Sequence, residues 1–382
     1  MKTKFGFFMA VFVFAAILFC GCGKKSGRTL TSATGTIYEC LVVMNENPLT
    51  QDEISSLKQP SLYGNGSAYD EPISTTYDLV RSVMAAPMPC LPQMEDYFQL
   101  SHVSIAEFDD FLKATRNILI VDLNPDRYTQ AKCTCVRDNW STPQAVCRIQ
   151  APSQEAFVAY WNEFGTAIRD WFVKQEIDRQ NKFYRNMTNQ EARTKLQNKW
   201  GCDMLICEDY MLIMDTTVLL NDEKVDFLWC CNSKGPIRRD LVLYRYPFRD
   251  ADTFTPEYLN AKRDLVLGQL VTAQLEGSHM GTEYDIFPPQ FRALSVQNNA
   301  YAAEIRGLWL ILDGENMGGP YVSHSRVDEY GQYVVTAEVF IFASGQKKRN
   351  ALRQAEAMLY TLKMPQELNA LDEVVVDKDS VE

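Results

Sequence analysis

The run Ser323-His-Ser-Arg-Val-Asp328 carries the residue types that serine hydrolases use for nucleophilic catalysis. If this run is a β-strand, its side chains alternate between the two faces of a sheet. His324, Arg326 and Asp328 then share one face, whereas Ser323 and Ser325 share the other. An adjacent serine therefore cannot reach His324 easily, although a distant serine could. The spacing argues against a catalytic triad built from this run alone.

Other catalytic patterns are missing from the chain. It has no Gly-x-Ser-x-Gly elbow, no Walker A loop and no His-Glu-x-x-His pair. Met317-Gly-Gly-Pro320 lacks the lysine that follows a phosphate-binding loop, so we predict a tight turn there. We expect a protein without catalytic residues and without a cofactor, and an unrecognised hydrolase is the least favoured alternative.

The same run could contribute to a polar face. Glu304 and Arg306 share one side of a strand expected over residues 301–312. If the two strands pair, these side chains converge with His324, Arg326 and Asp328. One interpretation is a solvated sheet face with ordinary ion pairs. The other is a recognition patch for a small anionic ligand, because arginine suits carboxylates and phosphates.

Eleven cysteines make metal binding and disulfide formation worth weighing. Cys133-Thr-Cys135 and the pair Cys202 and Cys207 look like metal pairs, but zinc sites require four ligands in recurring spacings. The three histidines, including His324, are not close in sequence to these cysteines. We interpret the thiols as small buried hydrophobes and predict no metal site. The cysteines that remain after the N-terminal segment are odd in number, so at least one is free or pairs with another chain: Cys40, Cys90, Cys133, Cys135, Cys147, Cys202, Cys207, Cys230 and Cys231.

The N-terminal residues have the pattern that is typical of an export signal with a membrane anchor. Lys2 and Lys4 precede an apolar run over residues 5–19, which is too short for a comfortable transmembrane helix and suits a signal peptide. Gly21 directly precedes Cys22, and this pattern resembles the lipobox of bacterial lipoproteins. The resemblance implies cleavage before Cys22 and its acylation, for example with palmitate. Several acyl chains make such attachment durable.

This reading places the protein in the cell envelope. Residues 1–21 form the lipoprotein signal peptide and residues 22–36 a flexible tether with a basic start. Among the lipoproteins that this segment resembles, those on the cell surface tend to carry acidic residues after the lipidated cysteine, so the resemblance implies that this basic tether faces the periplasmic side of the outer membrane. Membrane lipid is then the first expected partner, and an envelope protein is the second. With a net charge of −11, the chain has no basic excess for binding nucleic acid.

The chain alternates helical and strand-like segments. Strands are expected at residues 37–44, 98–103, 118–123, 133–136, 144–149, 203–217, 226–231, 241–247 and 301–312, with a hairpin over 321–342. Helices are expected at residues 76–84, 104–115, 153–185, 189–200, 255–270 and 347–363. The aromatic stripe on the 153–185 helix is assigned to core packing.

This mixture predicts an α+β fold with largely antiparallel sheets and long amphipathic helices. The chain is longer than the roughly 250–300 residues at which a single hydrophobic core stops growing. We therefore expect an N-terminal lobe over residues 37–200, a C-terminal lobe over 201–365 and a loose acidic tail over 366–382.

Several segments carry a resemblance to a known family. They are Arg116-Asn-Ile-Leu-Ile-Val121, Gly201-Cys-Asp-Met204, Arg306-Gly-Leu-Trp309, the stretch from Met317 to Asp328, and Leu359-Tyr-Thr-Leu-Lys363. They resemble a family of Bacteroidetes lipoproteins described as a domain of unknown function (DUF4837). The resemblance extends over residues 37–365. It implies an envelope lipoprotein and supplies no reaction, so the expected function is a non-catalytic binding or assembly module, with a small-ligand binder as the alternative.

Overall fold

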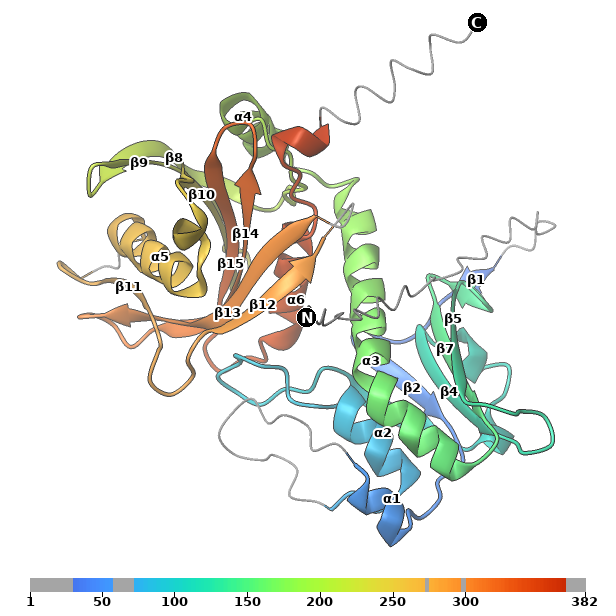
Figure 1. Cartoon of the computed structure of the whole chain (residues 1–382). Helices are drawn as coiled ribbons and strands as arrows, with labels where there is room; N and C mark the ends of the chain where they lie inside the picture. The colour runs from blue at the N-terminus through green and yellow to red at the C-terminus, as the bar shows by residue number, and fades with distance from the viewer. Residues whose placement is uncertain (1–29, 58–71, 272–274, 297–299, 369–382) are drawn as a thin grey trace, which may run out of the picture.

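A computed structural model describes residues 30–57, 72–271, 275–296 and 300–368 of the chain. Two β-sheets dominate these residues, one of five strands and one of eight, and helices pack between and beside them (Figure 1). The predicted mixed α+β class is confirmed.

The five-stranded sheet has the strand order β3-β2-β4-β7-β5. Its first four strands run parallel, and β5 runs antiparallel to β7 at the edge. The apolar run predicted as a central strand is β4, which is buried on both faces as parallel strands usually are. The strands are β2 (Glu39–Val43), β3 (Gln99–Val103), β4 (Asn117–Leu123), β5 (Lys132–Arg137) and β7 (Ala145–Ala151).

The eight-stranded sheet is antiparallel throughout. Its order is β11-β13-β14-β15-β10-β9-β8, with β12 also paired to β13. The sheet curls around one helix, α5, as Figure 1 shows. The strands are β8 (Met211–Leu220), β9 (Glu223–Asn232), β10 (Arg238–Pro247), β11 (His279–Thr282), β12 (Gln290–Ser295), β13 (Tyr301–Leu312), β14 (Gly318–Asp328) and β15 (Tyr333–Phe342).

Five of the six α-helices in the described residues begin at a residue whose side chain caps the helix. The side chain of Ser153 accepts a hydrogen bond from the Ala156 amide at the start of the longest helix, and Thr255 accepts one from the Tyr258 amide ahead of α5. Five of the six predicted helices form. The helices are α1 (Gln51–Ser55), α2 (Thr76–Met84), α3 (Gln154–Tyr184), α4 (Gln190–Trp200), α5 (Pro256–Leu270) and α6 (Arg349–Leu359).

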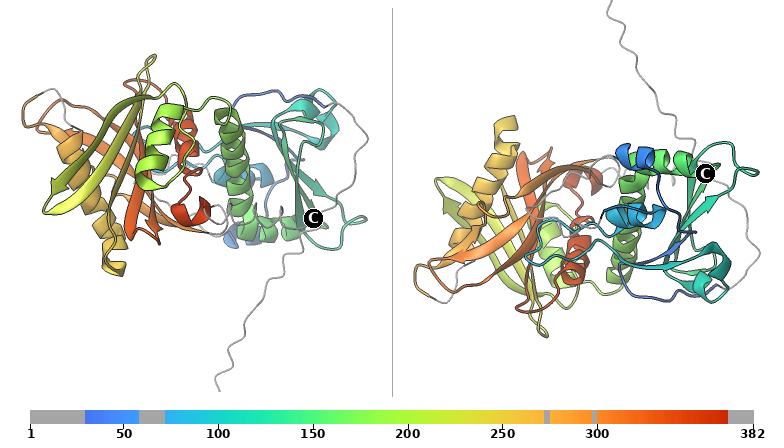
Figure 2. Two further views of the ribbon diagram at one scale, coloured as in Figure 1. Left: turned by 90° about the horizontal axis from the view of Figure 1, so that it is seen from above. Right: turned by 90° about the horizontal axis from the view of Figure 1, so that it is seen from below.

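Helix α6 lies between the two sheets. It packs on the face of the eight-stranded sheet opposite α5 and also contacts α3, which packs on the five-stranded sheet (Figure 2). One hydrophobic core includes Val42 of the first sheet, Phe172 of α3, Leu352 of α6 and Val339 of the second sheet. A separate core fills the space between α5 and the curled sheet. The predicted division into lobes at residue 200 falls at the C-terminal end of α4 and remains a prediction.

Three local predictions are wrong. The predicted helix at residues 104–115 is two short 3-10 turns, η1 (Ile105–Glu107) and η2 (Leu112–Ala114), because its Phe108 and Leu112 pack over the five-stranded sheet. The predicted strand at 203–217 begins only at Met211. The predicted turn at Met317-Gly-Gly-Pro320 is instead the start of β14. There the main chain of Gly319 approaches the Ile341 carbonyl so closely that a β-carbon would not fit.

Both ends of the described chain are more ordered than predicted. Thr31–Ser32 of the expected tether forms β1, which pairs with β6 (Ser141–Thr142). Residues 365–368, where the tail was expected to be loose from 366, are helical. The signal peptide, Cys22 and residues 369–382 lie outside the described residues. Within the described ranges, no helix is both long and apolar enough to cross a membrane.

Candidate functional site

The predicted polar face forms where β13 and β14 pair. Glu304 lies directly opposite His324, and their side chains meet at 3.2 Å between the carboxylate and Nε2. Arg306 donates two hydrogen bonds to the same carboxylate, at 2.8 and 3.0 Å. The two strands therefore pair, which is the condition for the expected polar face, and the pairing brings three of the five candidate residues together.

The expectation of a solvated sheet face is wrong, because α6 covers this face. Glu304 is 1% exposed, Arg306 6% and His324 0%. From α6, Glu356 binds the Arg306 guanidinium, and Arg353 binds Glu356 at 3.1 Å. The half-exposed side chain of Arg292, on β12, binds the Glu304 carboxylate at 3.1 Å. We call this set the buried charge cluster; its members are Arg292, Glu304, Arg306, His324, Arg353 and Glu356.

The cluster holds both of its carboxyl groups in the charged form. Burial alone would raise the pKa of Glu304, but attraction by Arg306 and hydrogen bonding from His324 lower it well below its ordinary value. Burial also opposes ionisation of Glu356, yet Arg306 and Arg353 lower its pKa. Three guanidinium groups thus face two carboxylates, an arrangement that fastens α6, β12, β13 and β14 to one another.

The other two predicted residues have separate partners. Arg326 binds the Glu367 carboxylate at 2.9 Å and the Leu362 carbonyl, so it holds the helical turn that follows α6. Asp328 accepts hydrogen bonds from the Tyr330 and Gly331 amides in the β14–β15 turn. Neither side chain belongs to the buried charge cluster.

The predicted separation of the serines from His324 is confirmed. The Ser325 hydroxyl hydrogen-bonds Thr336 at 2.8 Å on the α5 side of the sheet, whereas His324 contacts Glu304 on the α6 side. The His324 Nδ1 atom has no hydrogen-bond partner among the described residues. An anionic ligand at this site would have to replace the carboxylate of Glu304 or Glu356 as the partner of the guanidinium groups. The binding of a small anionic ligand at this site stays a prediction.

Sequence reasoning missed the residues that α6 contributes. A signal was present in the sequence, because Glu356 lies four residues after the apolar Leu352, and side chains four residues apart share one face of a helix such as the one expected at 347–363. A charged residue at such a position requires a buried partner of opposite sign. Arg353 and Arg306 supply it.

A second buried ion pair lies on the opposite face, inside the curled sheet. Arg263 of α5 donates to both oxygens of Glu338 on β15, and the two side chains are 2% and 0% exposed. The Arg263 guanidinium also donates to the Thr282 hydroxyl at 2.7 Å and lies 3.8 Å from the centre of the Tyr321 ring. This pair fixes α5 within the curl.

A shallow polar pocket of about 170 Å³ lies beside the β8–β9 turn. Glu223 sits in its wall and already binds Lys262 and Arg249. The two cationic side chains that line the pocket, Arg249 and Lys262, are therefore already paired with the Glu223 carboxylate. The remaining lining residues are Leu220, Asn221 and Tyr258.

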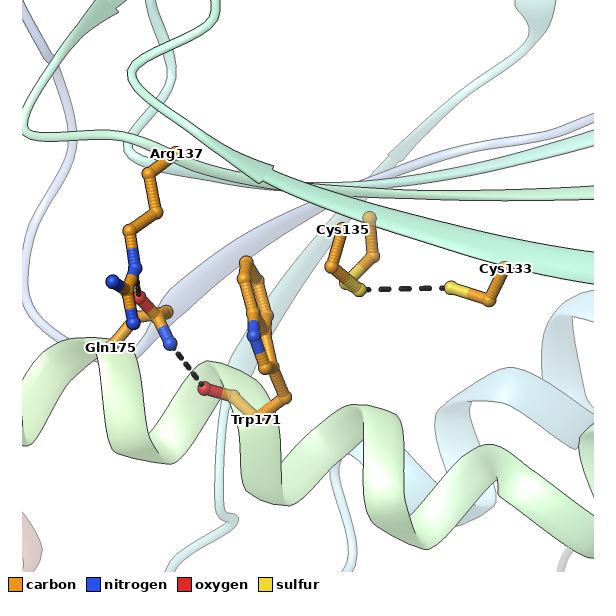
Figure 3. Close-up of a disulfide and its surroundings, with 6 residues drawn as sticks. Cys133, Cys135, Arg137, Trp171 and Gln175 are labelled. Atoms are coloured by element: carbon orange, nitrogen blue, oxygen red, sulfur yellow. Dashed lines mark hydrogen bonds between the residues drawn. A yellow bond between two sulfur atoms is a disulfide. The ribbon is translucent and has the colours of Figure 1, made fainter. Parts of the chain in front are cut away.

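The interpretation of the cysteines as small buried hydrophobic thiols is wrong for two of them. Cys135 of β5 and Cys147 of β7 lie opposite each other and form a disulfide (Figure 3). Cys133 lies beside this bond as a thiol. The three sulfur atoms lie within 4.8 Å of one another, but two of them are bonded together, so one thiol is available there. The other described cysteines are free and buried: Cys40, Cys90, Cys202, Cys207, Cys230 and Cys231.

The lowered pKa of Glu304 predicts how the Glu304→Gln variant responds to acid. An ordinary glutamate in the unfolded chain has a pKa of about 4.3, so the carboxylate contributes its full stabilisation above that pH. Below it, the gap in unfolding free energy between wild type and variant should shrink by about 1.4 kcal/mol per pH unit. Urea unfolding between pH 7 and pH 3 measures this gap. A gap that already shrinks between pH 7 and pH 6 would contradict the lowered pKa.

Two different family models match two separate segments of the chain. A family model described as domain of unknown function (DUF4837) matches residues 189–361, and one described as domain of unknown function (DUF8532) matches residues 70–185. The predicted likeness to DUF4837 is therefore confirmed for the second part of the chain, which contains the buried charge cluster. Its expected extent over residues 37–365 is wrong, since the first part matches a different model. No curated protein matches the chain.

Proposed function

We propose that the protein is a non-catalytic assembly module of the bacterial envelope, a Bacteroidetes lipoprotein held through Cys22 on the periplasmic side of the outer membrane. The module holds an extended segment of a partner protein along strand β8. The observation that carries this proposal is the open edge of β8. In the described residues this ten-residue strand pairs with β9 on one side and with no strand on the other.

The side chains of β8 suit protein binding. Met211, Ile213 and Leu219 are 55%, 49% and 68% exposed. The strand carries one charged residue, Asp215, which Lys199 neutralises at 2.8 Å. Edge strands that must avoid pairing usually carry lysine or proline, and β8 has neither. An added strand would gain main-chain hydrogen bonds together with contacts to these apolar side chains.

The charge of the chain favours a different protein over a second copy. Each copy carries a net charge of −11, so two copies repel each other at long range. A neutral or basic extended segment with alternating apolar residues avoids that repulsion.

The buried charge cluster supports a structural role, because its guanidinium groups are occupied by the chain's own carboxylates.

Photocrosslinking in intact cells tests the docking edge. A photoreactive phenylalanine at position 213 should capture one partner protein, identified by mass spectrometry. Adding Met211→Lys and Leu219→Lys should reduce capture about tenfold, which corresponds to about 1.4 kcal/mol of binding energy. The matched control is Phe111→Lys, since Phe111 is 79% exposed and directly precedes η2, which packs over the five-stranded sheet and not over the sheet that contains β8; it should leave capture unchanged.

Two outcomes would overturn the docking proposal. Capture of a second copy of this chain would replace the partner with self-association, and capture that survives both lysines would remove β8 from the interaction. The anchor has its own test, because Cys22→Ala should move the protein from the membrane fraction to the soluble fraction. Retention of that variant in the membrane would exclude lipidation at Cys22 as the anchor.

A further inference from the structure

A free thiol lies next to a disulfide at the edge of the five-stranded sheet. Cys135 and Cys147 occupy opposite positions on β5 and β7. Cys133 precedes Cys135 by two residues, so both side chains point to the same face of β5. The Sγ atoms of Cys133 and Cys135 are 3.7 Å apart, as the dashed line in Figure 3 marks.

The three cysteine residues differ in burial. Cys147 is fully buried, whereas Cys133 and Cys135 are only half-buried between β5 and α3. Because β5 is an edge strand, one side of its backbone makes no ladder hydrogen bonds to other described residues, and the strand can adjust locally. A thiol arriving from solvent therefore meets Cys135 before Cys147, and Cys133 is beside it.

We propose that Cys133, Cys135 and Cys147 form a thiol–disulfide exchange site, in which Cys135 accepts a substrate thiol and Cys133 resolves the mixed disulfide. The substrate class is a thiol, either a small molecule or a cysteine of another protein.

Each step exchanges one sulfur–sulfur bond for another and needs no oxidant. The substrate thiolate attacks Cys135 Sγ, the Cys135–Cys147 bond breaks, and Cys147 leaves as a thiolate that takes a proton. Cys133 loses its proton and attacks the same Cys135 Sγ. The bond between Cys135 and the substrate breaks, the substrate thiolate is released, and a Cys133–Cys135 disulfide remains. The bridge has then moved from between β5 and β7 to within β5.

The surroundings of Cys133 set the pH dependence of the second step. Burial raises the pKa of Cys133 to about 11. Tyr160 of α3 faces it, and Trp171, Gln175 and Arg137 lie further along the same interface (Figure 3). Since the thiolate is the attacking form, resolution should accelerate about tenfold per pH unit and about a hundredfold between pH 7 and pH 9.

Trypsin separates the two disulfide forms cleanly. Cleavage after Lys132, Arg137 and Arg148 places Cys133 and Cys135 on one peptide, 133–137, and Cys147 on another, 138–148. The starting form therefore yields two linked peptides. The product form yields peptide 133–137 with an internal disulfide and peptide 138–148 with a free thiol.

The experiment uses glutathione as the thiol probe on the full chain. In Cys147→Ser protein, glutathione attached to Cys135 should be released as the 133–137 disulfide forms, about a hundredfold faster at pH 9 than at pH 7. It should persist in the Cys133→Ser, Cys147→Ser double variant. Cys207→Ser in the Cys147→Ser background is the matched control, because Cys207 is also a free cysteine and lies outside this site; it should release glutathione at the same rate.

Wild-type protein gives a second readout that needs no substitution. Incubation with reduced glutathione at pH 9 should produce the internal disulfide of peptide 133–137 together with free Cys147. Equal persistence of glutathione in the single and double variants would overturn the proposal. So would wild-type protein in which only the Cys135–Cys147 linkage is ever recovered.

Discussion

Replacing Glu356 with alanine should lower the free energy of unfolding by about 3–5 kcal/mol. The Glu356 side chain is 0% exposed and binds both Arg306 and Arg353, whose side chains are 8% and 4% exposed. Its removal leaves three guanidinium groups in the cluster opposite the single carboxylate of Glu304. A guanidinium cannot shed its proton, so the excess charge stays in the protein interior. Urea unfolding monitored by circular dichroism measures the loss.

The control for this prediction is Glu163→Ala. Glu163 is exposed on α3, so the same change of side chain should leave the unfolding midpoint nearly unchanged. A loss below about 1 kcal/mol for Glu356→Ala would mean that water reaches the cluster and screens it. Such a result would restore the solvated sheet face that the sequence suggested.

Local patterns predicted the elements better than their partners. The apolar run at residues 118–123 is β4, and the aromatic stripe after Ser153 is α3, because periodicity and N-capping act over a few residues. The segment 104–115 failed because its apolar side chains pack on the sheet, which is a tertiary effect. Strand alternation correctly placed Glu304 and Arg306 on one side of their strand, and the pairing of β13 with β14 brings His324 to them.

What covers that face could not be read from the strands alone. Glu356 lies 50 residues beyond Arg306 in sequence, and only the packing of α6 brings the two together. The Cys135–Cys147 disulfide was missed for a related reason. The spacing of cysteines along the sequence does not reveal which strands are neighbours in a sheet. Only the pairing of β5 with β7 shows that Cys135 lies opposite Cys147.

The Arg263–Glu338 pair inside the curled sheet should show an asymmetry between its two members. Glu338→Leu leaves the Arg263 guanidinium buried and permanently charged, so it should cost about 3–5 kcal/mol of stability. Arg263→Met should cost less, because the carboxyl group of Glu338 can take up a proton. Burial already raises the pKa of Glu338 even with Arg263 present.

The sign of the pH dependence distinguishes the two variants. In Arg263→Met the folded-state pKa of Glu338 lies above its unfolded value, so the protonated form favours folding. Stability of that variant should therefore recover relative to wild type as the pH falls from 7 to 5 and decline again as it rises. Glu338→Leu has no carboxyl group at this position and should show no such recovery.

The double variant Arg263→Met with Glu338→Leu should be more stable than either single variant. It replaces a buried ion pair with apolar side chains of similar volume, which is often neutral or stabilising by about 1–4 kcal/mol. Thr282 still has a partner, because its hydroxyl also bonds Asp264. Urea unfolding of the four proteins completes a double-mutant cycle. If the two single losses simply add, the pair is not a coupled ion pair and does not hold α5 within the curled sheet.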